Sequence, residues 1–375
     1  MMQRETLDKL GAVLFLLAIV GLVVYLIIGR ERAYQSAWDP ENLVAASYTE
    51  SLSDGQARCT LCPNNCLLSS GQTGVCRARR NIDGTLYSLV YGKIASRHVD
   101  PIEKKPLYHF LPGTNVYSIA TAGCNLQCKY CQNWSLSQQN PENVEYVEMT
   151  PQEVIDEALA SGSESIAFTY NEPSVFFEFM LDTAELAKAN QLHTVWVTSG
   201  YINQEPLAEL IPYLDAANVD LKGMSDEFYL DITSGRLQPV LDTIVALHEA
   251  GVHVEITNLV IPGENDSDQM LSDLISWVYN TLGEDVVLHF SRFHPDYQLL
   301  NIPPTPVETL EKARQMALDT GLHYVYVGNV GDASMNTTYC RDGSVGIARS
   351  QFFVTEDNLN NGVCADGTVI SGVWE

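Results

Sequence analysis

Short apolar stretches alternate with amphipathic stretches between residues 113 and 330. The apolar stretches predict strands, and the spacing of apolar residues between them predicts helices that begin near residues 150, 175, 240, 267 and 305. Thr150-Pro151-Gln152-Glu153 and Thr305-Pro306-Val307-Glu308 each have the form of a capping box with proline in the first turn. The predicted strands are 116–120, 165–169, 193–198, 216–221, 252–260, 286–290 and 324–327. This alternation predicts an α/β domain whose parallel sheet forms a barrel or part of one.

The chain begins with a different pattern, because residues 10–28 contain no charged side chain. A helix needs about 20 such residues to cross a bilayer, so we predict a single-pass membrane anchor within residues 1–33. A cleaved signal peptide is the alternative, but Gly29-Arg30-Glu31-Arg32 does not resemble a small-residue cleavage site. The polar residues 34–57 are predicted to link this anchor to the folded part of the chain.

Composition narrows the classes of partner. The 375 residues include 47 acidic and 21 basic side chains, for a formal net charge of −26, and 46% of the residues are hydrophobic. The hydrophobic content is sufficient for a large core. The negative charge opposes binding to a polyanion, so we expect no nucleic-acid partner.

Seven of the nine cysteines fall in two tight groups, which favours metal binding over a disulfide framework. The second group, Cys124, Cys128 and Cys131, directly follows a predicted strand. Three thiolates on a four-iron cluster leave one iron open to a ligand, so this spacing favours a reactive iron–sulfur cluster. A zinc site with its fourth ligand elsewhere is the alternative. Because such thiolates persist best where thiols stay reduced, we place the body of the protein on the cytoplasmic face of the membrane.

The first group contains four thiols, Cys59, Cys62, Cys66 and Cys76, with Pro63, Gly71 and Gly74 supplying turns between them. Four thiols can complete a closed tetrahedral site, which is usually structural. Spacing alone leaves structural zinc and an auxiliary iron–sulfur cluster open.

Residues 84–112 lead from this group to the α/β domain. We predict a strand over 85–91 and then a proline-bounded loop, in which Glu103-Lys104-Lys105 forms a solvated turn. His98 and His109 have no ligand spacing and are predicted to be structural.

Polar residues follow the predicted strands at the ends where parallel α/β folds place their sites. They are Tyr170-Asn171-Glu172-Pro173, Thr198-Ser199-Gly200-Tyr201, Asp220 and Lys222, Asn258 with Ile261-Pro262-Gly263, and Ser291-Arg292-Phe293-His294. Together they predict a site that holds a zwitterionic small molecule against the open iron.

The motif Cys124-x3-Cys128-x2-Cys131, with Tyr130 before the last cysteine, resembles the radical SAM signature. The wider pattern is similar to the AmmeMemoRadiSam system radical SAM enzymes, which are relatives of the pyruvate formate-lyase activating enzyme. It comprises Cys59-Thr-Leu-Cys62-Pro-Asn-Asn-Cys66, Leu86-Tyr-Ser-Leu-Val-Tyr-Gly-Lys93, Asp100-Pro-Ile-Glu-Lys-Lys-Pro-Leu107 and Cys131-Gln-Asn-Trp134. The resemblance spans residues 58 to 330 and implies a partial (βα) TIM-like barrel that cleaves S-adenosylmethionine (SAM) reductively to a 5′-deoxyadenosyl radical. That radical would abstract hydrogen from an unknown substrate.

The resemblance also implies roles for individual residues. Cys124, Cys128 and Cys131 would bind a 4Fe-4S cluster, Tyr130 would lie beside the adenine, and Asn171 or Glu172 would contact the methionine amino group. The segments Thr198-Ser199-Gly200 and Asp220-Leu-Lys222 resemble those that hold the SAM carboxylate and ribose, and Asn258 belongs to the adenine-side strand. His294, in the last polar group, completes the predicted cofactor contacts.

The implied partners are a reductant protein such as flavodoxin or ferredoxin, and a protein substrate or a partner from the AmmeMemo system. Two alternative functions are a glycyl-radical-enzyme activase and a non-catalytic iron–sulfur electron carrier on the membrane. The predicted domains are the anchor (1–33), the linker (34–57), a Cys-rich module (58–112), the partial barrel (113–330) and a C-terminal extension (331–375). The resemblance implies two paired-cysteine knuckles in the extension, but glycine stands where each second cysteine would be, so Cys340 and Cys364 cannot form a four-thiolate zinc site.

Overall fold

The computed structural model describes residues 16–17, 19–24 and 39–375, which divide into two compact units, Met1–Ala45 and Ala46–Glu375. In the first unit the described residues form helical turns at 16–17 and 19–24, the 3₁₀ turn η1 (Pro40–Asn42) and the strand β1 (Val44–Ala45). Within the described part of the chain, no helix has the length and apolar character needed to cross a membrane.

This finding corrects the predicted membrane localisation. The described helical residues, 16–17 and 19–24, rise about 1.5 Å each, so together they span much less than a hydrocarbon core of about 30 Å. The rest of the predicted anchor lies outside the described residues. The cytoplasmic placement depended on that anchor and is withdrawn with it.

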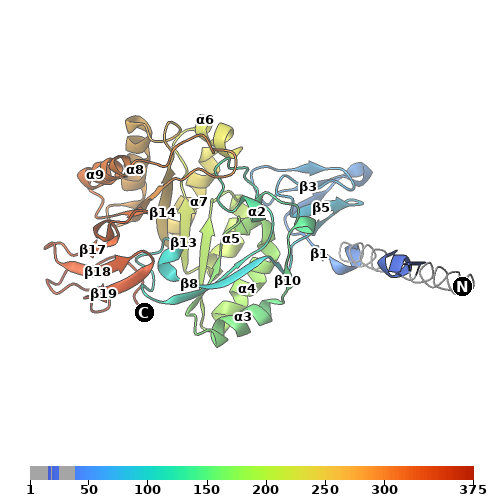
Figure 1. The fold of residues 1–375 in the computed structure, drawn as a ribbon, viewed down its shortest axis with the longest axis horizontal. Helices are drawn as coiled ribbons and strands as arrows, with labels where there is room; N and C mark the ends of the chain where they lie inside the picture. The colour runs from blue at the N-terminus through green and yellow to red at the C-terminus, as the bar shows by residue number, and fades with distance from the viewer. Residues whose placement is uncertain (1–15, 18, 25–38) are drawn as a thin grey trace, which may run out of the picture. The chain divides into compact units, whose positions relative to one another are not determined.

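The second unit is built on an eight-stranded sheet (Figure 1). Its strands pair in the order β8, β9, β11, β12, β13, β14, β15 and β16, and only β8, at one edge, runs antiparallel to its neighbour. Their bounds are Ser96–Pro101, Asn115–Ala120, Ser165–Phe168, His193–Thr198, Ala216–Asp220, His253–Val260, Val287–Arg292 and Tyr324–Gly328. Among the described residues the edge strands β8 and β16 do not pair with each other, so the sheet is open, and the predicted α/β class is confirmed.

Helices cross over between successive parallel strands and lie around the outside of the sheet (Figure 1). They are α3 (Pro151–Ala160), α4 (Phe177–Ala189), α5 (Gln204–Leu210), α7 (Leu237–Glu249), α8 (Asp268–Leu282) and α9 (Val307–Thr320). The pattern did not predict α5, which has too few residues to show a helical period. It also missed the short α6 (Asp226–Phe228) and the π-helical turn η7 (Tyr229–Thr233).

The two predicted capping boxes have different outcomes. At α3, Thr150 Oγ1 accepts from Glu153 N, and the Glu153 carboxylate accepts from Thr150 N at 2.7 Å, which confirms the first. The second is wrong because the Thr305 hydroxyl donates to Val260 O at 2.6 Å and accepts from Phe293 N. The hydroxyl is therefore hydrogen-bonded to buried backbone groups at the ends of β14 and β15, and α9 begins at Val307 without a side-chain cap.

Short antiparallel strands surround the first cysteine group. The strand β2 (Thr49–Ser51) lies within the predicted linker and pairs with β3 (Ala57–Cys59), which pairs in turn with β4 (Leu67–Leu68). A hairpin follows, formed by β5 (Arg79–Ile82) and β6 (Thr85–Ser88). The short strand β7 (Lys93–Ile94) then pairs with β10 (Val147–Glu148).

The predicted solvated turn at Glu103-Lys104-Lys105 is wrong, because Glu103 and Lys105 are each only 1% exposed. Lys105 Nζ lies 2.6 Å from Asp100 Oδ2, and the Glu103 carboxylate accepts from Gly113 N at 2.9 Å. Arg349, far along the chain, places its guanidinium 3.6 Å from Glu103. These ionic partners make burial of the charges tolerable.

The C-terminal residues pack near the amino ends of the sheet strands. An antiparallel sheet of β17 (Thr338–Tyr339), β18 (Val345–Ser350) and β19 (Phe353–Asp357) is accompanied by a disulfide between Cys340 and Cys364. The two cysteines lie in a buried cluster with residues from β15 and β16, among them Val287 and Tyr326. The disulfide was not predicted. It leaves the seven other cysteines free.

A buried polar network lies in the same region. The Glu255 carboxylate accepts from Tyr108 N at 2.8 Å and His109 N at 2.7 Å, and it lies 2.6 Å from His289 Nε2. His109 is fully buried, with Nδ1 2.8 Å from Ser371 O and Nε2 2.7 Å from the Tyr326 hydroxyl. Burial lowers the pKa of His109 to about 3, against a partial opposing effect of Glu255.

This pKa predicts acid sensitivity. Unfolded His109 takes up a proton near pH 6.5, whereas folded His109 stays neutral until about pH 3. The free energy of unfolding should therefore fall as the pH drops from 6.5, by up to about 1.4 kcal/mol per pH unit from this one group. We expect His109→Gln to show a shallower loss than wild type between pH 6.5 and 5 in urea titrations, with His98→Gln, at an exposed position, as the control. Equal slopes in wild type and His109→Gln would contradict this assignment.

Candidate active site

The loop of residues 121–137 follows β9 and carries Cys124, Cys128 and Cys131. Its backbone is held from outside: Gln127 N donates to Thr233 O at 2.8 Å, and Lys129 N donates to Ile232 O at 3.0 Å. The Asn125 side chain donates to Tyr201 O at 2.7 Å. The π-helical turn η7 and the segment after β12 therefore fix the path of the loop.

The loop also depends on a glycine at its start. Gly123 has φ +96, and a Cβ there would lie 2.4 Å from Cys76 O. Cys124 N donates to the same carbonyl at 3.2 Å. Only glycine allows this approach between the loop and the Cys-rich module.

The three thiols are set in an environment suited to metal binding. Leu126 N donates to Cys124 Sγ at 3.4 Å, and Cys131 Sγ lies 3.1 Å from Ser137 Oγ. Burial raises the pKa of Cys128 to about 11, although Lys222 opposes the rise. Without a metal these thiols keep their protons, so metal binding must displace them.

A cavity of about 510 Å³ opens beside these thiols at the carboxyl ends of the strands. All three cysteines line it, together with seven of the ten predicted cofactor contacts. Those seven are Tyr130, Asn171, Glu172, Thr198, Ser199, Asp220 and Lys222. The structure thus brings together predicted site residues from four separate stretches of the chain.

Three predicted contacts do not line the cavity. Gly200 shapes the turn after β12, where its φ is +67 and its N donates to Thr198 Oγ1. Asn258 is buried and donates to Leu221 O at 2.8 Å, so it joins neighbouring strands. His294 is exposed and does not line the cavity.

Glu172 is the most heavily hydrogen-bonded group in the cavity wall. Its Oε1 accepts from Ser174 N, Ser174 Oγ and Thr198 Oγ1 at 3.1, 2.6 and 2.7 Å. Its Oε2 accepts from Ser199 N and Ser199 Oγ at 2.8 and 2.6 Å. These five bonds use most of the acceptor capacity of the carboxylate, so its main role in this arrangement is to fix Thr198 and Ser199.

Asn171, by contrast, has a free acceptor. Its Nδ2 donates to Gly123 O at 2.9 Å, whereas its buried Oδ1 has no partner among the described residues. The buried Thr257 Oγ1, which also lines the cavity, is unpartnered too. Leaving such an atom without a hydrogen bond costs about 1–3 kcal/mol, which a ligand with a suitably placed donor would recover.

A cation lies next to the thiols. Lys222 Nζ is 2.9 Å from Asp220 Oδ2 and 5.9 Å from the centre of the Tyr130 ring. Burial alone would lower the pKa of Lys222, but Asp220, Tyr130 and Cys128 outweigh it and hold the pKa well above its usual value. Lys222 is therefore a permanent positive charge in the cavity wall.

Sequence reasoning missed several lining residues. Lys104 and Lys105 had been read as a solvated turn, yet Lys105 Nζ lies 4.4 Å from the centre of the Tyr170 ring. Asn329, near the end of β16, was missed as well; its Nδ2 donates at 3.0 Å to Ser291 Oγ, which belongs to the predicted polar group at the end of β15. The strand-end rule could have found Asn329, whereas nothing local indicated Lys105.

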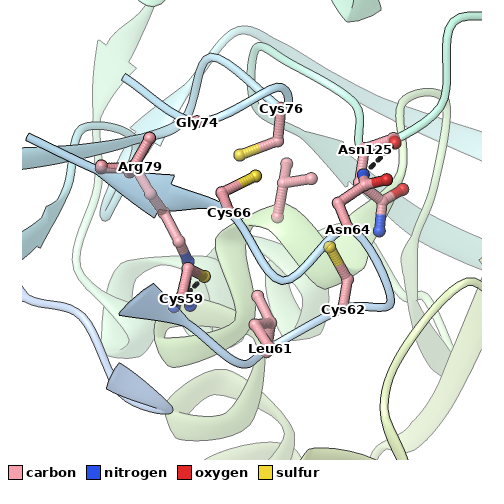
Figure 2. A pocket seen from close by; sticks show the side chains of 11 residues that line it. Cys59, Leu61, Cys62, Asn64, Cys66, Gly74, Cys76, Arg79 and Asn125 are labelled. Atoms are coloured by element: carbon pink, nitrogen blue, oxygen red, sulfur yellow. Dashed lines mark hydrogen bonds between the residues drawn. The ribbon is translucent and has the colours of Figure 1, made fainter. Parts of the chain in front are cut away.

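The four cysteines of the first group line a separate, enclosed cavity of about 20 Å³ (Figure 2). Arg79 and Asn125 also line it. Burial raises the pKa of Cys76 to about 11, with a further contribution from Cys59. The two cysteine groups thus occupy distinct cavities, one open and one closed.

The model of the radical SAM superfamily matches residues 118–275, which include the three-cysteine loop and the strands from β11 to β14. An uncharacterized protein of Methanocaldococcus jannaschii, MJ0808, is 46% identical over 316 residues, covering 84% of this chain and 94% of its own length. The chain belongs to the radical SAM superfamily. It is a radical SAM enzyme related to pyruvate formate-lyase activating enzymes.

More distant relatives cover about half of this radical SAM enzyme. The pyruvate formate-lyase-activating enzyme of Clostridium pasteurianum is 25% identical over 220 residues, covering 52% of this chain and 85% of that protein. Among solved structures, a radical SAM methyltransferase from Sphaerobacter thermophilus aligns with a TM-score of 0.48 and 14% identity, covering 77% of this chain and 78% of that one.

The close approach at Gly123 can be tested by substitution. Gly123→Ala should lower both the iron content of the reconstituted enzyme and the free energy of unfolding, because the added Cβ would displace Cys76 O. Gly162→Ala is the matched control, since Gly162 has φ +69 but nothing within 4 Å of its Cβ position. The free energy of unfolding of the control should fall only by the roughly 1–2 kcal/mol that alanine costs at a positive φ, and its iron content should stay unchanged. Equal effects of the two substitutions would contradict the proposed contact.

Proposed function

We propose that this radical SAM enzyme binds a 4Fe-4S cluster through Cys124, Cys128 and Cys131 and cleaves SAM reductively at the adjoining cavity. The observation that supports it is the shared cavity, in which three thiols face an unpartnered amide oxygen and a buried lysine. Of the described residues that line this cavity, no other is a cysteine and none is a histidine. Three thiolates leave one iron of such a cluster available to a ligand.

The cavity residues fit a zwitterionic ligand. Asn171 Oδ1 would accept a hydrogen bond from the methionine ammonium of SAM, and Lys222 would attract its carboxylate. Ser199 is fixed by Glu172 and would add a hydroxyl at the same wall. Asp220 would accept hydrogen bonds from ribose hydroxyls, and the Tyr130 ring would lie against the adenine.

The bound cluster would supply the electron that breaks a sulfonium carbon–sulfur bond and yields a 5′-deoxyadenosyl radical. The side chains of the cavity would orient SAM and limit the access of water. A reductant protein such as flavodoxin or ferredoxin would deliver the electron. The substrate would be a small molecule or a protein, including a partner in the AmmeMemo system that the sequence motifs resemble.

A second candidate function is activation of a glycyl-radical enzyme. It is supported by the relatives, which include the pyruvate formate-lyase-activating enzyme of Clostridium pasteurianum and the 4-hydroxyphenylacetate decarboxylase activating enzyme of Clostridium scatologenes, each 25% identical. A non-catalytic electron carrier on the membrane is no longer an alternative, since the chain is an enzyme and the described residues contain no membrane span.

Cleavage of SAM is the direct test. The anaerobically reconstituted enzyme with dithionite should release 5′-deoxyadenosine, and Cys128→Ala should abolish the release because the cluster loses one of its three thiolates. His294→Ala is the control, since His294 lies outside the cavity, and it should retain wild-type activity. Full iron occupancy without release of 5′-deoxyadenosine, under conditions in which a known radical SAM enzyme is active, would refute the proposal.

The role of Asn171 makes a separate prediction. Asn171→Leu has a similar volume but no acceptor, so the Kd for SAM should rise about tenfold or more, as expected for a lost hydrogen bond to a charged group. Equilibrium binding of radiolabelled SAM to protein of equal iron content measures this. An unchanged Kd would assign the ammonium to another acceptor.

A further inference from the structure

The four-cysteine cavity is built from parts of the chain that flank the active-site loop in space (Figure 2). We propose that Cys59, Cys62, Cys66 and Cys76 bind one metal centre with no open coordination position, and that this centre positions the active-site loop for SAM. The inference rests on the proposed function, because its readout is SAM binding and cleavage.

The donor set and its surroundings support a metal. Four free thiols line one cavity, two of them less than 9% exposed, and no disulfide joins them. Arg79 is 1% exposed and pairs with Glu178 at 2.5 Å, its Nη1 also lies 3.9 Å from Cys59 Sγ, and its buried Nε has no partner among the described residues. A cation and an unsatisfied donor beside four thiols match the negative charge that a tetrathiolate centre carries.

The cavity is too small for a substrate. Its volume of about 20 Å³ corresponds to about one or two water-sized particles. Within the described residues, no three of these sulfurs lie within 4.8 Å of one another. A single zinc ion would therefore draw the thiols together, whereas an iron–sulfur cluster would widen the cavity. Either centre would have all four positions filled by protein.

Two hydrogen bonds join this site to the start of the active-site loop. Cys76, one of the four ligands, accepts from Cys124 N at 3.2 Å through its carbonyl oxygen. Asn64, between two other ligands, donates to Asn125 O at 2.8 Å. A metal that fixes Cys62, Cys66 and Cys76 thus also fixes the backbone on both sides of Cys124.

A second connection reaches the segment after β12, whose Ser199 also lines the larger cavity. Asn203 N donates to Leu61 O at 3.0 Å, and Asn203 Nδ2 donates to Thr60 O at 2.7 Å. Both acceptors lie between Cys59 and Cys62. Asn203 ends the segment that begins at Ser199, so loss of the metal would loosen two parts of the cavity wall together.

The experiment combines metal analysis with SAM kinetics in the full-length, anaerobically reconstituted enzyme. Wild type should hold about four irons for the active-site cluster plus either about one zinc or about four further irons. Cys62→Ser and Cys66→Ser should each lose the same additional metal but keep the active-site irons. The KM for SAM should rise about 10-fold or more, and the SAM-induced change in the electron paramagnetic resonance (EPR) spectrum of the reduced cluster should weaken.

Two further variants separate positioning from folding. Asn64→Ala keeps all four thiols, so it should keep the additional metal yet still raise the KM for SAM. The double variant Cys340→Ser with Cys364→Ser removes two cysteines that line neither cavity, and it should leave both metal contents and the KM unchanged.

Wild type with no metal beyond the four active-site irons would overturn the proposal. So would Cys62→Ser and Cys66→Ser variants that lose the additional metal while the KM and the EPR change stay at wild-type values. If wild type itself released no 5′-deoxyadenosine, the proposed function would fail instead, and the metal analysis alone would still show whether the four cysteines bind metal.

Discussion

Hydrogen bonds from outside the loop determine where the three thiols of the active site lie. Residues 121–137 contain only the single helical turn α2 (Trp134–Ser137), so most backbone groups near the cysteines find partners elsewhere. The turn η7 supplies Thr233 O and Ile232 O, the segment after β12 supplies Tyr201 O, and the Cys-rich module supplies Cys76 O. The loop is therefore a meeting point of the module and the sheet, and its geometry depends on both.

The charged groups of the cavity wall are also held in place by their partners. Glu172 has no basic partner, yet five donors stabilise its carboxylate and tie the ends of two neighbouring strands together. Lys222 and Asp220 form a pair beside the thiols, and Asn171 keeps one acceptor free. A cavity arranged in this way is preorganised for a ligand that carries both an ammonium and a carboxylate.

The sequence was sufficient for features that depend on local order. The parallel strands and most of the crossover helices follow from their apolar periods, and the Thr150 capping box involves residues three apart. The fold and the superfamily were therefore accessible, and so was the grouping, in one cavity, of seven residues predicted to contact a cofactor.

Features that depend on distant partners were not accessible in this way. Thr305 matches a capping box, but Val260 and Phe293 use its hydroxyl. Glu103 is buried because Arg349 lies beside it, and Cys340 pairs with Cys364 across 24 residues. The apolar stretch of residues 10–28 failed in another way. Its hydrophobicity alone predicted a membrane anchor, and the described helices do not support that prediction.

In the function we propose, SAM binds to the open iron of a cluster held by Cys124, Cys128 and Cys131. Electron–nuclear double resonance on the dithionite-reduced enzyme, with SAM labelled with ¹⁵N at its amino group, tests it most directly. We expect a hyperfine coupling between the cluster and the labelled nitrogen. Bound SAM that leaves the spectrum of the reduced cluster free of any such coupling would contradict it.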